Sequence, residues 1–477
     1  MTSLTEIKQY FDSIALQRKK WLNKGKFFHQ EDLRVFKDLI PEGSNVLELG
    51  CGNGHLLNGL KPKIGIGIDI SKNLIQEGKK DYPNLELISG NAENASKLVD
   101  SNVNLDYIII CDSIGYIKDI QNLFGEIQKL TKPHTRLIIT YFSPLWVPFL
   151  SIATFLKLKM KIPNTSLLYP ADIKNFLKIS NFDTVRTEKK ILFPYKFFGL
   201  GRLINRFIAV VPFISNLCLR HYVIARSLKF SKNNVPKSAS IIIPCKNEEK
   251  NIKLAISRIP KFTNDIEVIF VEGNSKDRTW NEIQKVIKDN KTKKKFSVKG
   301  FKQKGKGKAD AVFLGFEKAK NDVLIILDAD LTVAPEDLGK FWEKIFSGDA
   351  EFVNGTRLVY PMDNDAMRYL NHIANRGFSL LFTWLLGQRY TDTLCGTKVI
   401  KKNDFFKIKK QIPDFEDFDP FGDFYLIFGS QKLCLKMVEI PIRYKARVHG
   451  ETQISRFTHG LLLIKMLLVA FFRIKAI

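Results

Sequence analysis

The sequence predicts an α/β protein with two domains, each built on a mostly parallel sheet. The chain has 477 residues, too many for one ordinary core, and 45% of them are hydrophobic, enough to fill two. Short apolar segments alternate with helical or loop sequence in two successive series. A polar run at 231–238 separates the series. We therefore expect one domain at 1–230, a linker at 231–238 and a second domain at 239–477.

The apolar segments are short and nearly free of polar residues, which is typical of strands buried on both faces of a sheet. The first series consists of five segments, at 45–49, 64–68, 85–88, 107–110 and 137–140. The second series begins at 240–243, continues at 267–271 and 323–327, and then mixes with longer helices.

The charge of the chain predicts a polyanionic partner. Its formal net charge is +26 and its pI is about 9.6. Nucleic acid, an anionic membrane surface and phosphorylated substrates all fit this charge. The lysine-rich segment 291–295 has no interleaved aromatic residues, so it resembles a solvated loop more than a nucleic-acid patch. We therefore expect no nucleic-acid partner.

Several features predict a cytoplasmic protein. The six cysteines are scattered without a zinc-ligand or C-x-x-C spacing, which favours reduced thiols. Residues 1–26 carry charges throughout and lack the apolar core of a signal peptide. No segment gives about 20 apolar residues free of charge. Two shorter segments, 142–156 and 461–477, fit either core helices or helices lying on the inner face of a membrane.

A glycine-rich turn in the first half predicts a nucleoside site. Gly50, Gly52 and Gly54 follow a strand and precede a helix, and glycine lets the backbone turn sharply beside a ligand. The next strand ends at Asp69, where a carboxylate can accept both ribose hydroxyls. A nicotinamide dinucleotide site is the alternative. It is disfavoured because Glu48 precedes the glycines and no second phosphate-binding turn follows.

From about Asn45 to Arg226 the chain resembles class I methyltransferases, which have a Rossmann-like sheet. The resemblance implies S-adenosylmethionine as cofactor, with Asp69 on the ribose. It implies a cofactor site made of Glu48, Gly50, Gly52, Gly54, Asp69, Asn91, Ala92, Glu93 and Asp112. The family often has Asp in place of Asn91. Methyl transfer depends on positioning and requires no unique base, so the acceptor, a small molecule or a glycan, is not identified.

The segment 141–191 follows the last strand of this first series. It contains Trp146, Asn164 and Tyr169. We expect it either to cover the cofactor as a lid or to belong to the ordinary core.

In the second half, an apolar strand at 323–327 ends in two carboxylates one residue apart, Asp328 and Asp330. Both can reach a single hard cation such as Mg²⁺ or Mn²⁺ and leave room for diphosphate oxygens. Such a pair also occurs in ordinary solvated turns. The strand at 240–243 is stopped by Pro244 and followed by a polar turn into a helix.

From Ser238 onward these features resemble family 2 glycosyltransferases of the GT-A fold, especially those that act on polyprenyl phosphates. The resemblance implies a nucleotide-sugar donor, with Asp328 and Asp330 as the metal pair and Lys306 near the diphosphate. The donor site that it implies consists of Pro244, Asn247, Glu248, Glu272, Ser275 and Lys306. Gly273 stands where the family has a second acid.

The acceptor is predicted from a set of cations and one acid. The resemblance places five basic residues in the acceptor half: Arg357, Arg368, Lys398, Arg443 and Arg447. Asp423 falls near the family's base position, and an acid at a helix N-terminus is the simpler interpretation. An ionised lipid phosphate needs cations and no base, whereas a sugar hydroxyl needs a base. We expect a polyprenyl phosphate or a lipid-linked glycan, and the alternative is a soluble glycan or protein hydroxyl with Asp423 as base.

Two other functions fit parts of the sequence. A nucleic-acid methyltransferase with a degenerate second domain would suit the charge, and a binding protein could be built from two inactive enzyme folds. The retained glycines of the first turn and the retained pair Asp328 and Asp330 argue against both.

Overall fold

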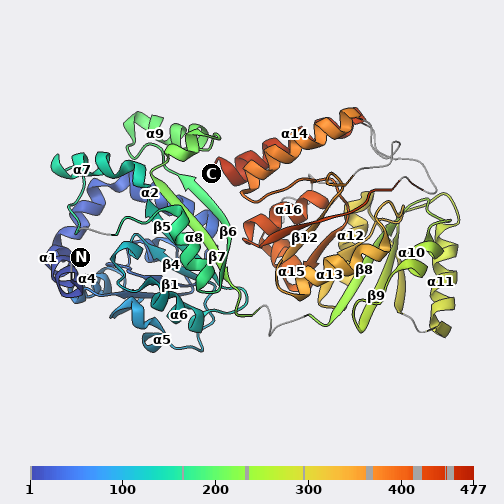
Figure 1. Ribbon diagram of the computed structural model, residues 1–477, viewed down its shortest axis with the longest axis horizontal. Coiled ribbons are helices and arrows are strands. Elements are labelled where there is room, and N and C mark those ends of the chain that lie inside the picture. The colour runs from blue at the N-terminus through green and yellow to red at the C-terminus, as the bar shows by residue number, and fades with distance from the viewer. Residues whose placement is uncertain are drawn as a thin grey trace. The chain divides into compact units, whose positions relative to one another are not determined.

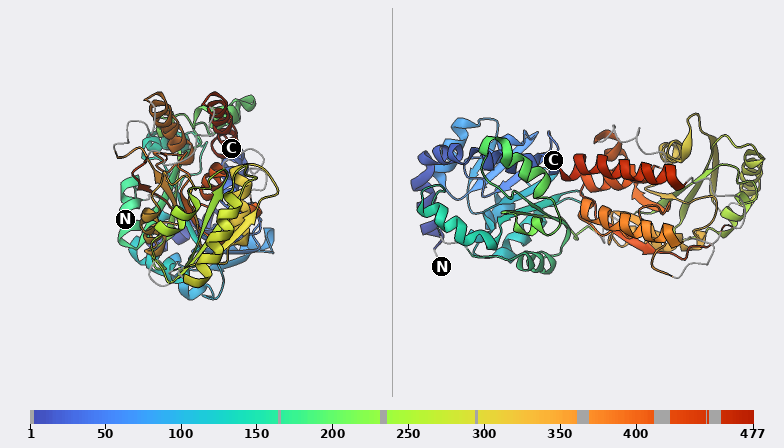
Figure 2. Two further views of the ribbon diagram at one scale, coloured as in Figure 1. Left: turned by 90° about the vertical axis from the view of Figure 1, so that its right-hand side faces the viewer. Right: turned by 90° about the horizontal axis from the view of Figure 1, so that it is seen from above.

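The computed structural model describes residues 3–163, 166–230, 236–293, 296–360, 369–411, 422–445, 447 and 456–477. Contacts divide the chain into two compact units. One unit comprises Met1–Phe230 together with Lys475–Ile477, and the other comprises Ser231–Ile474. In each unit, helices flank a single sheet (Figure 1, Figure 2).

The N-terminal unit contains a seven-stranded sheet in the order β3-β2-β1-β4-β5-β7-β6. The first five of these strands in the chain are parallel, and β7 is antiparallel to both β5 and β6. The strands are β1 (Asn45–Leu49), β2 (Ile64–Asp69), β3 (Glu86–Ser89), β4 (Tyr107–Cys111), β5 (Arg136–Phe142), β6 (Phe182–Lys190) and β7 (Arg220–Ser227). The predicted α/β class and the five predicted strands of this unit are confirmed.

Helices of this unit begin at recognisable caps. Ser3 and Glu6 form a capping box at α1, and the side chains of Ser71 and Asp119 cap α4 and α6. The helices are α1 (Leu4–Lys24), α2 (Lys26–Leu39), α3 (His55–Gly59), α4 (Lys72–Asp81), α5 (Ala95–Leu98), α6 (Ile120–Leu130), α7 (Val147–Phe155), α8 (Pro170–Ile179) and α9 (Leu200–Leu203).

Ligands of open α/β sheets bind where the strand order reverses, at the carboxyl ends of the strands. Here the reversal lies between β1 and β4, which pair with each other while β2 and β5 lie outside them. The glycine turn follows β1, and Asp112 follows β4. The fold therefore brings both to one crevice.

The C-terminal unit contains a second seven-stranded sheet, in the order β10-β9-β8-β11-β13-β12-β14. β8 to β11 are parallel to their neighbours in that group, and β13 is antiparallel to β11 and β12. The strands are β8 (Ser238–Cys245), β9 (Asp265–Glu272), β10 (Ser297–Lys302), β11 (Val323–Ile326), β12 (Phe352–Thr356), β13 (Lys398–Lys401) and β14 (Met437–Pro441).

Both faces of this sheet are buried by helices. Along β8, Ile241 and Ile243 pack into one apolar cluster, while Ile242 between them packs into the other. The helices are α10 (Ile252–Arg258), α11 (Thr279–Lys293), α12 (Gly307–Lys318), α13 (Leu338–Phe346), α14 (Tyr369–Leu386), α15 (Lys402–Gln411), α16 (Asp423–Lys432) and α17 (Arg456–Ala470). Because β8 and β11 are parallel neighbours in the sheet, their carboxyl ends lie side by side.

The two apolar segments with open interpretations differ in the structure. α7 buries none of its residues, so the core-helix interpretation of 142–156 is wrong for this helix. α17 buries Leu463 and Met466 in the core, while Leu461 and Leu468 are exposed. Among the described residues, no helix is both long and apolar enough to cross a membrane.

Candidate active sites

The glycine turn after β1 requires glycine for two reasons. Gly50, Gly52 and Gly54 all have positive φ, at 80°, 58° and 77°, a region that side chains disfavour. A Cβ on Gly50 would lie 2.3 Å from the Cβ of Ser113, which itself donates a hydrogen bond to the Leu49 carbonyl. The turn is thus held close against the loop after β4.

Asp69, at the end of β2, faces this turn. The Gly52 N–H donates to Asp69 Oδ2 at 2.7 Å, and the Ser71 N–H donates to Oδ1 at 2.9 Å. Burial raises the pKa of Asp69 above its ordinary value, while these two backbone hydrogen bonds act to lower it. Each carboxylate oxygen can accept a further hydrogen bond, so the group suits a ribose.

Glu48 lies buried beneath the turn, and its Oε2 atom has no hydrogen-bond partner. Burial, followed by the nearby charge of Asp69, raises the pKa of Glu48 to about 8. A buried carboxylate oxygen without a partner carries a desolvation cost that a bound donor would remove. The residues therefore fit the polar methionine end of S-adenosylmethionine.

The loop after β3 is organised by local hydrogen bonds. Asn91 Oδ1 accepts from the Glu93 N–H at 3.0 Å and caps a short 3-10 helix, in which Ala92 is buried. Glu93 Oε1 accepts from the Lys118 N–H at 2.9 Å. The Gly90 N–H donates to the Asp69 carbonyl at 2.9 Å, which ties this loop to β2. The adenine contact of this loop stays a prediction.

Asp112 belongs to a buried ionic network that the sequence did not reveal. Its φ is 57°, and its carboxylate pairs with the guanidinium of Arg220 on β7. Arg220 is completely buried and also donates to both carboxylate oxygens of Asp32 at 3.1 Å and to Thr140 Oγ1 at 3.0 Å. Burial raises the pKa of Asp112, and the Arg220 charge opposes that rise.

Two further cations act on the same acids. Burial lowers the pKa of Arg18 on α1, while the carboxyls of Asp112 and Asp69 act in the opposite direction. Burial also lowers the pKa of Lys159, in the segment after α7, with Asp112 opposing it. No motif distinguishes these residues from surface cations, because only the fold brings α1 and this segment to the carboxyl edge of the sheet.

In the C-terminal unit, the loops after β8 and β9 are bound to each other. Asn247 has a φ of 56°, and its N–H donates to Ser275 Oγ at 3.0 Å. The Glu248 N–H donates to Thr279 Oγ1 at 2.9 Å. The Ser275 N–H in turn donates to Glu272 Oε1 at 2.5 Å. The structure thus brings these predicted donor-site residues together, with Pro244 immediately before them on β8.

The acid pair follows β11, and each acid meets a cation. Asp328 Oδ1 lies 2.6 Å from Lys308 Nζ, and Asp330 Oδ2 lies 2.8 Å from the Arg447 guanidinium. Burial would raise the pKa of Asp328, but the charge and hydrogen bond of Lys308, together with the charges of Lys398 and Arg357, hold the pKa below its ordinary value. Asp330 Oδ1 accepts from the N–H and hydroxyl of Thr332. Both acids are therefore anionic positions that favour positive charge.

Lys308 is a site residue that the sequence analysis missed. α12 begins at Gly307, whose φ is 89°, and Lys308 in its first turn reaches Asp328. Lys306, just before the helix, is exposed. The two residues lie in the same lysine-rich segment. They differ because Lys308 belongs to the first turn of α12, whereas Lys306 precedes the helix. The role of Lys306 toward a diphosphate stays a prediction.

Asp423 begins α16 after Gly422, whose φ is 74°. Its carboxyl is buried, and Oδ1 lies 3.3 Å from Nζ of the fully buried Lys398, without a well-aligned hydrogen bond. Burial lowers the pKa of Lys308, but the charge of Asp328 and then the charge of Asp423 raise it, and the pKa lies above its ordinary value. The predicted base and the predicted metal pair therefore lie in one electrostatic cluster.

The predicted acceptor cations are mostly engaged. Arg357 forms a bidentate pair with Asp392, with N···O distances of 2.6 and 2.9 Å. The Arg443 guanidinium lies 5.9 Å from the centre of the Tyr360 ring. Arg368 falls outside the described residues. This set is therefore a network of paired cations, in contrast to an open basic patch.

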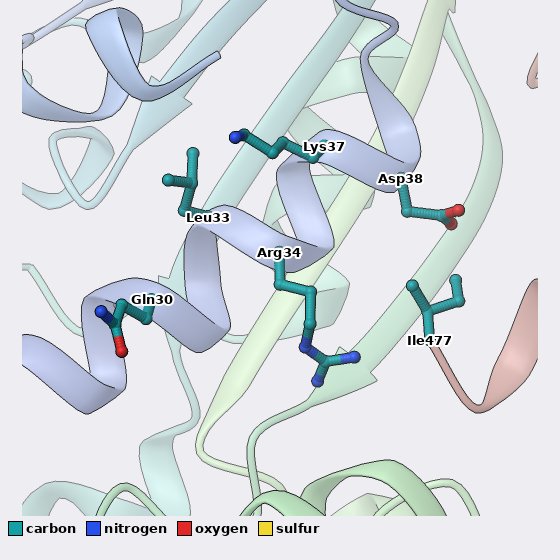
Figure 3. A pocket seen from close by; sticks show the side chains of 6 residues that line it. All are labelled: Gln30, Leu33, Arg34, Lys37, Asp38 and Ile477. Carbon is teal, nitrogen blue, oxygen red and sulfur yellow. The ribbon is translucent and has the colours of Figure 1, made fainter.

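The described residues contain no cluster of three or more His, Cys, Asp or Glu side chains with metal-binding geometry. All six cysteines are free thiols, as predicted. The hollow in Figure 3 runs along α2, and none of its lining residues belongs to either set of site residues. It is lined by Gln30, Leu33, Arg34, Lys37, Asp38 and Ile477.

Comparisons with known proteins match both halves of the chain. A family model described as "Glycosyl transferase family 2" matches residues 240–414, and one described as "Methyltransferase domain" matches residues 40–188. The chain resembles a SAM-dependent methyltransferase from Thermotoga maritima at 15% identity and a TM-score of 0.35, covering 46% of this chain and 99% of that one.

Two curated relatives match the C-terminal half. The dolichol-phosphate mannosyltransferase of Pyrococcus furiosus is 28% identical over 223 residues, which cover 45% of this chain and 59% of that enzyme. The UDP-N-acetylglucosamine–dolichyl-phosphate N-acetylglucosaminyltransferase of Methanococcus voltae is 27% identical over 240 residues, which cover 47% and 92%. The first of these alignments spans less than two thirds of its relative.

Proposed function

The chain joins a methyltransferase domain to a family 2 glycosyltransferase domain, and from this premise we propose a bifunctional transferase. Its C-terminal unit transfers a sugar from a nucleotide-sugar to a polyprenyl phosphate or lipid-linked glycan. Its N-terminal unit binds S-adenosylmethionine and methylates a separate acceptor. The observation that carries the sugar-transfer proposal is the cluster of Asp328, Lys308, Asp423 and Lys398 at the carboxyl edge of the second sheet.

The acid pair fits a divalent cation. Asp328 and Asp330 offer carboxylate oxygens, the ligands that Mg²⁺ and Mn²⁺ prefer, and both already attract side-chain cations. A bound cation would neutralise charge on the departing nucleoside diphosphate. Hydrogen bonds hold Asn247, Ser275 and Glu272 to one another and Glu248 to Thr279, and we propose that these residues form a donor-binding wall beside the acid pair.

The acceptor is best explained as a phosphate. A polyprenyl phosphate arrives ionised, so its oxygen needs cationic positioning and no base. The buried Lys398 and the paired Arg357 supply such charge near Asp328 and raise the acidity of its carboxyl. Both relatives' names state a dolichol or dolichyl phosphate acceptor for those enzymes. A single displacement by this acceptor would invert the anomeric carbon.

A hydroxyl acceptor is the second candidate, supported by the buried carboxylate of Asp423 at the start of α16. The substitution Asp423→Asn removes the charge and keeps the size of the side chain. If Asp423 is a base, hydroxyl transfer falls by about 10²–10⁴-fold. If the acceptor is an ionised phosphate, the loss is smaller, because only the balance of charge around Lys398 changes.

The donor is found by incubating the full chain with a panel of nucleotide-sugars. Nucleoside diphosphate release is measured with a polyprenyl phosphate, a soluble oligosaccharide or no acceptor. We expect release that depends on the polyprenyl phosphate. Release stimulated by the oligosaccharide alone would favour the hydroxyl acceptor, and no release from any donor would contradict sugar transfer.

The N-terminal unit is proposed to hold S-adenosylmethionine through Asp69 at the ribose and Glu48 at the methionine end. When bound, this cofactor supplies an electrophilic methyl group. The contribution of the chain is orientation, with the turn at Gly50–Gly54 against the cofactor and the Arg220–Asp112 pair fixing the wall beside it. Attachment of the protein to the inner face of an anionic membrane completes the proposal and rests on the lipid acceptors of the relatives and the net charge of +26.

A further inference from the structure

Two segments of the N-terminal unit expose a continuous run of large apolar side chains. The first comprises 144–158 and contains α7, and the second comprises 197–217 and contains α9; together we call them the apolar face. Phe155 is 86% exposed, Phe198 102% and Phe213 87%. The face also exposes Phe149, Leu156, Leu200, Leu203 and Leu217. Monomeric soluble proteins rarely expose apolar residues at this density without a partner.

The two segments are joined to each other. The indole N–H of Trp146 donates to the Leu217 carbonyl at 2.7 Å, and the Ser143 N–H donates to the Leu219 carbonyl at 2.8 Å. In Figure 1, α7 and α9 lie on the same side of the N-terminal unit, in teal and green. The hydrogen bonds connect the two segments at their bases, so the exposed side chains belong to one surface.

All charged residues within the two segments of the apolar face are basic. The sequence contains no Asp or Glu between Glu126 and Asp172, and none between Glu188 and Glu248. Exposed basic residues flank the apolar side chains in both segments: Lys157, Lys161, Lys196, Arg202 and Arg206. Arg202 also lies 3.6 Å from the buried Glu31 carboxylate. Segments that combine exposed apolar side chains with basic residues and no acids match the interface of an anionic bilayer, where the acyl region accepts the apolar side chains and the headgroups attract the cations.

The face continues into the wall of the cofactor site. Burial lowers the pKa of Lys159, just after α7, and the charges of Asp112 and Arg18 also act on this pKa. The Tyr10 hydroxyl on α1 donates to the Lys161 carbonyl, and the Ser166 N–H donates to the Gly115 carbonyl at 3.0 Å, in the loop after β4. A bilayer in contact with the apolar face would therefore lie near the residues that contact α1 and the loop after β4.

We infer that the apolar face of the N-terminal unit docks in the surface of an anionic phospholipid bilayer. It lies on the methyltransferase side of the chain and is distinct from the α17 segment. Docking would bring the loop after β4, which lies beside the proposed cofactor site, toward the membrane. The inference does not depend on either transferase activity. If the protein both docks on the membrane and transfers a methyl group, an acceptor that resides in the membrane would follow.

Flotation of the full chain with vesicles tests the docking. We compare phosphatidylglycerol and phosphatidylcholine vesicles at low salt, with the wild type and the triple variant Phe155→Ser, Phe198→Ser, Leu203→Ser. The wild type should float with phosphatidylglycerol, and the triple variant should bind at least about tenfold more weakly, because each lost ring or isobutyl group removes buried apolar area. Equal flotation of the two proteins would overturn the inference.

A matched control removes three exposed apolar residues outside the face: Leu16→Ser, Ile179→Ser, Phe346→Ser. It should float as well as the wild type, and an equal loss in this control would overturn the inference. The pair Lys157→Glu, Lys196→Glu reverses the rim charge, leaves the apolar side chains in place and should also weaken binding to phosphatidylglycerol.

The oligomeric state and cofactor binding are measured on the same proteins. If light scattering finds a dimer that the triple variant converts to a monomer, a second copy covers the face and the inference is overturned. Unchanged affinity for S-adenosylmethionine shows that the triple variant is folded. Failure of the wild type to bind this cofactor would contradict the proposed function alone and leave the flotation result intact.

Discussion

The backbone N–H groups of Gly52 and Ser71 fix Asp69 at the end of β2, where we propose that it holds a ribose. We predict that Asp69→Ala weakens binding of S-adenosylmethionine to the full chain by at least about tenfold, since hydrogen bonds to a charged group contribute about 1.5–3 kcal/mol. Isothermal calorimetry measures the affinity. The control is Asp81→Ala, an acid at the end of α4 that pairs with Lys19 on the surface. Equal affinity in wild type and Asp69→Ala would contradict the assignment.

Glu48 predicts a pH dependence of stability. Its folded pKa of about 8, raised by burial and then by Asp69, lies above the ordinary value of 4.5. The native state therefore holds its proton more tightly than the unfolded state, so stability falls as the pH rises between these values. Full ionisation costs on the order of 5 kcal/mol. We expect Glu48→Gln to raise the melting temperature of the N-terminal unit at pH 8 and to leave it nearly unchanged at pH 5.

Melting curves of wild type and Glu48→Gln from pH 5 to 9 measure this effect. Parallel curves at every pH would contradict a raised pKa of Glu48 in the native state, because a group with the same pKa in both states adds no pH dependence to stability. Addition of S-adenosylmethionine should narrow the difference at pH 8, because its ammonium group can pair with the ionised carboxylate.

The sequence predicted the residues that belong to local motifs and missed those that are joined by the fold. Glu48 and Asp69 occur at fixed places around a glycine turn, so a short pattern identifies them. Asp32 and Arg220 come from α2 and β7, and an isolated Arg is ordinarily a surface residue. Their pairing becomes visible only when both elements reach Asp112.

At the scale of elements, the start of α12 decides which lysine meets the acid pair. Lys308→Met removes the counter-charge of Asp328, and we expect sugar transfer to fall by at least about a hundredfold, since an unpaired charge in the cleft is costly. Lys306→Met is the matched variant from the same loop. We expect it mainly to raise the KM for the donor, because its exposed charge attracts the diphosphate from outside. Steady-state kinetics of both variants measure the contrast, and a larger loss of kcat in Lys306→Met would contradict it.

Elements with continuous apolar sequence were predicted correctly, whereas polar buried strands were not. β1, β4 and β5 read as strands because each contains three Val, Ile or Leu residues within a short segment. β7 is buried along seven of its eight residues, yet it begins with Arg220 and His221. A buried guanidinium is tolerated there because Asp32 and Asp112 compensate its charge, which no strand pattern displays.

α17 shows why deletion is a poor test of membrane attachment by the C-terminal segment. Its buried Met466 and Leu463 belong to the core of the C-terminal unit, and Lys475 pairs with Glu188 in the N-terminal unit. Removing 461–477 would take Leu463 and Met466 out of the core of the C-terminal unit and would remove a cation that pairs with the buried Glu188. Substituting Leu461, Leu468 and Phe472 with Ser changes only the exposed face, and we expect these substitutions to reduce flotation with phosphatidylglycerol vesicles without lowering the melting temperature. Unchanged flotation would show that this helix does not contact the membrane.

For the whole molecule, the two units have separate apolar cores and separate site residues. Their activities should therefore be separable in one full-length protein. Length and the order of strands and turns predicted an α/β chain with two domains, and the resemblance of its motifs to two families predicted that both are enzymes. The methyl acceptor was not predictable, because methyl transfer depends on the position of the acceptor. The class of sugar acceptor came from the resemblance, and the sequence did not show that Arg357, Lys398 and Arg447 pair with acids of the chain itself.

The most direct measurement combines two assays, sugar transfer to a polyprenyl phosphate and binding of S-adenosylmethionine. Both assays are run on one preparation of the wild type and one of Asp330→Asn, each with and without EDTA. Without a cation, the donor diphosphate would meet the acids directly, and a like-charge contact at about 4 Å costs a few kcal/mol. We predict that EDTA or Asp330→Asn lowers sugar transfer by orders of magnitude and leaves cofactor binding unchanged. Full sugar transfer in EDTA, or by Asp330→Asn, would contradict a metal-assisted glycosyltransferase at this acid pair.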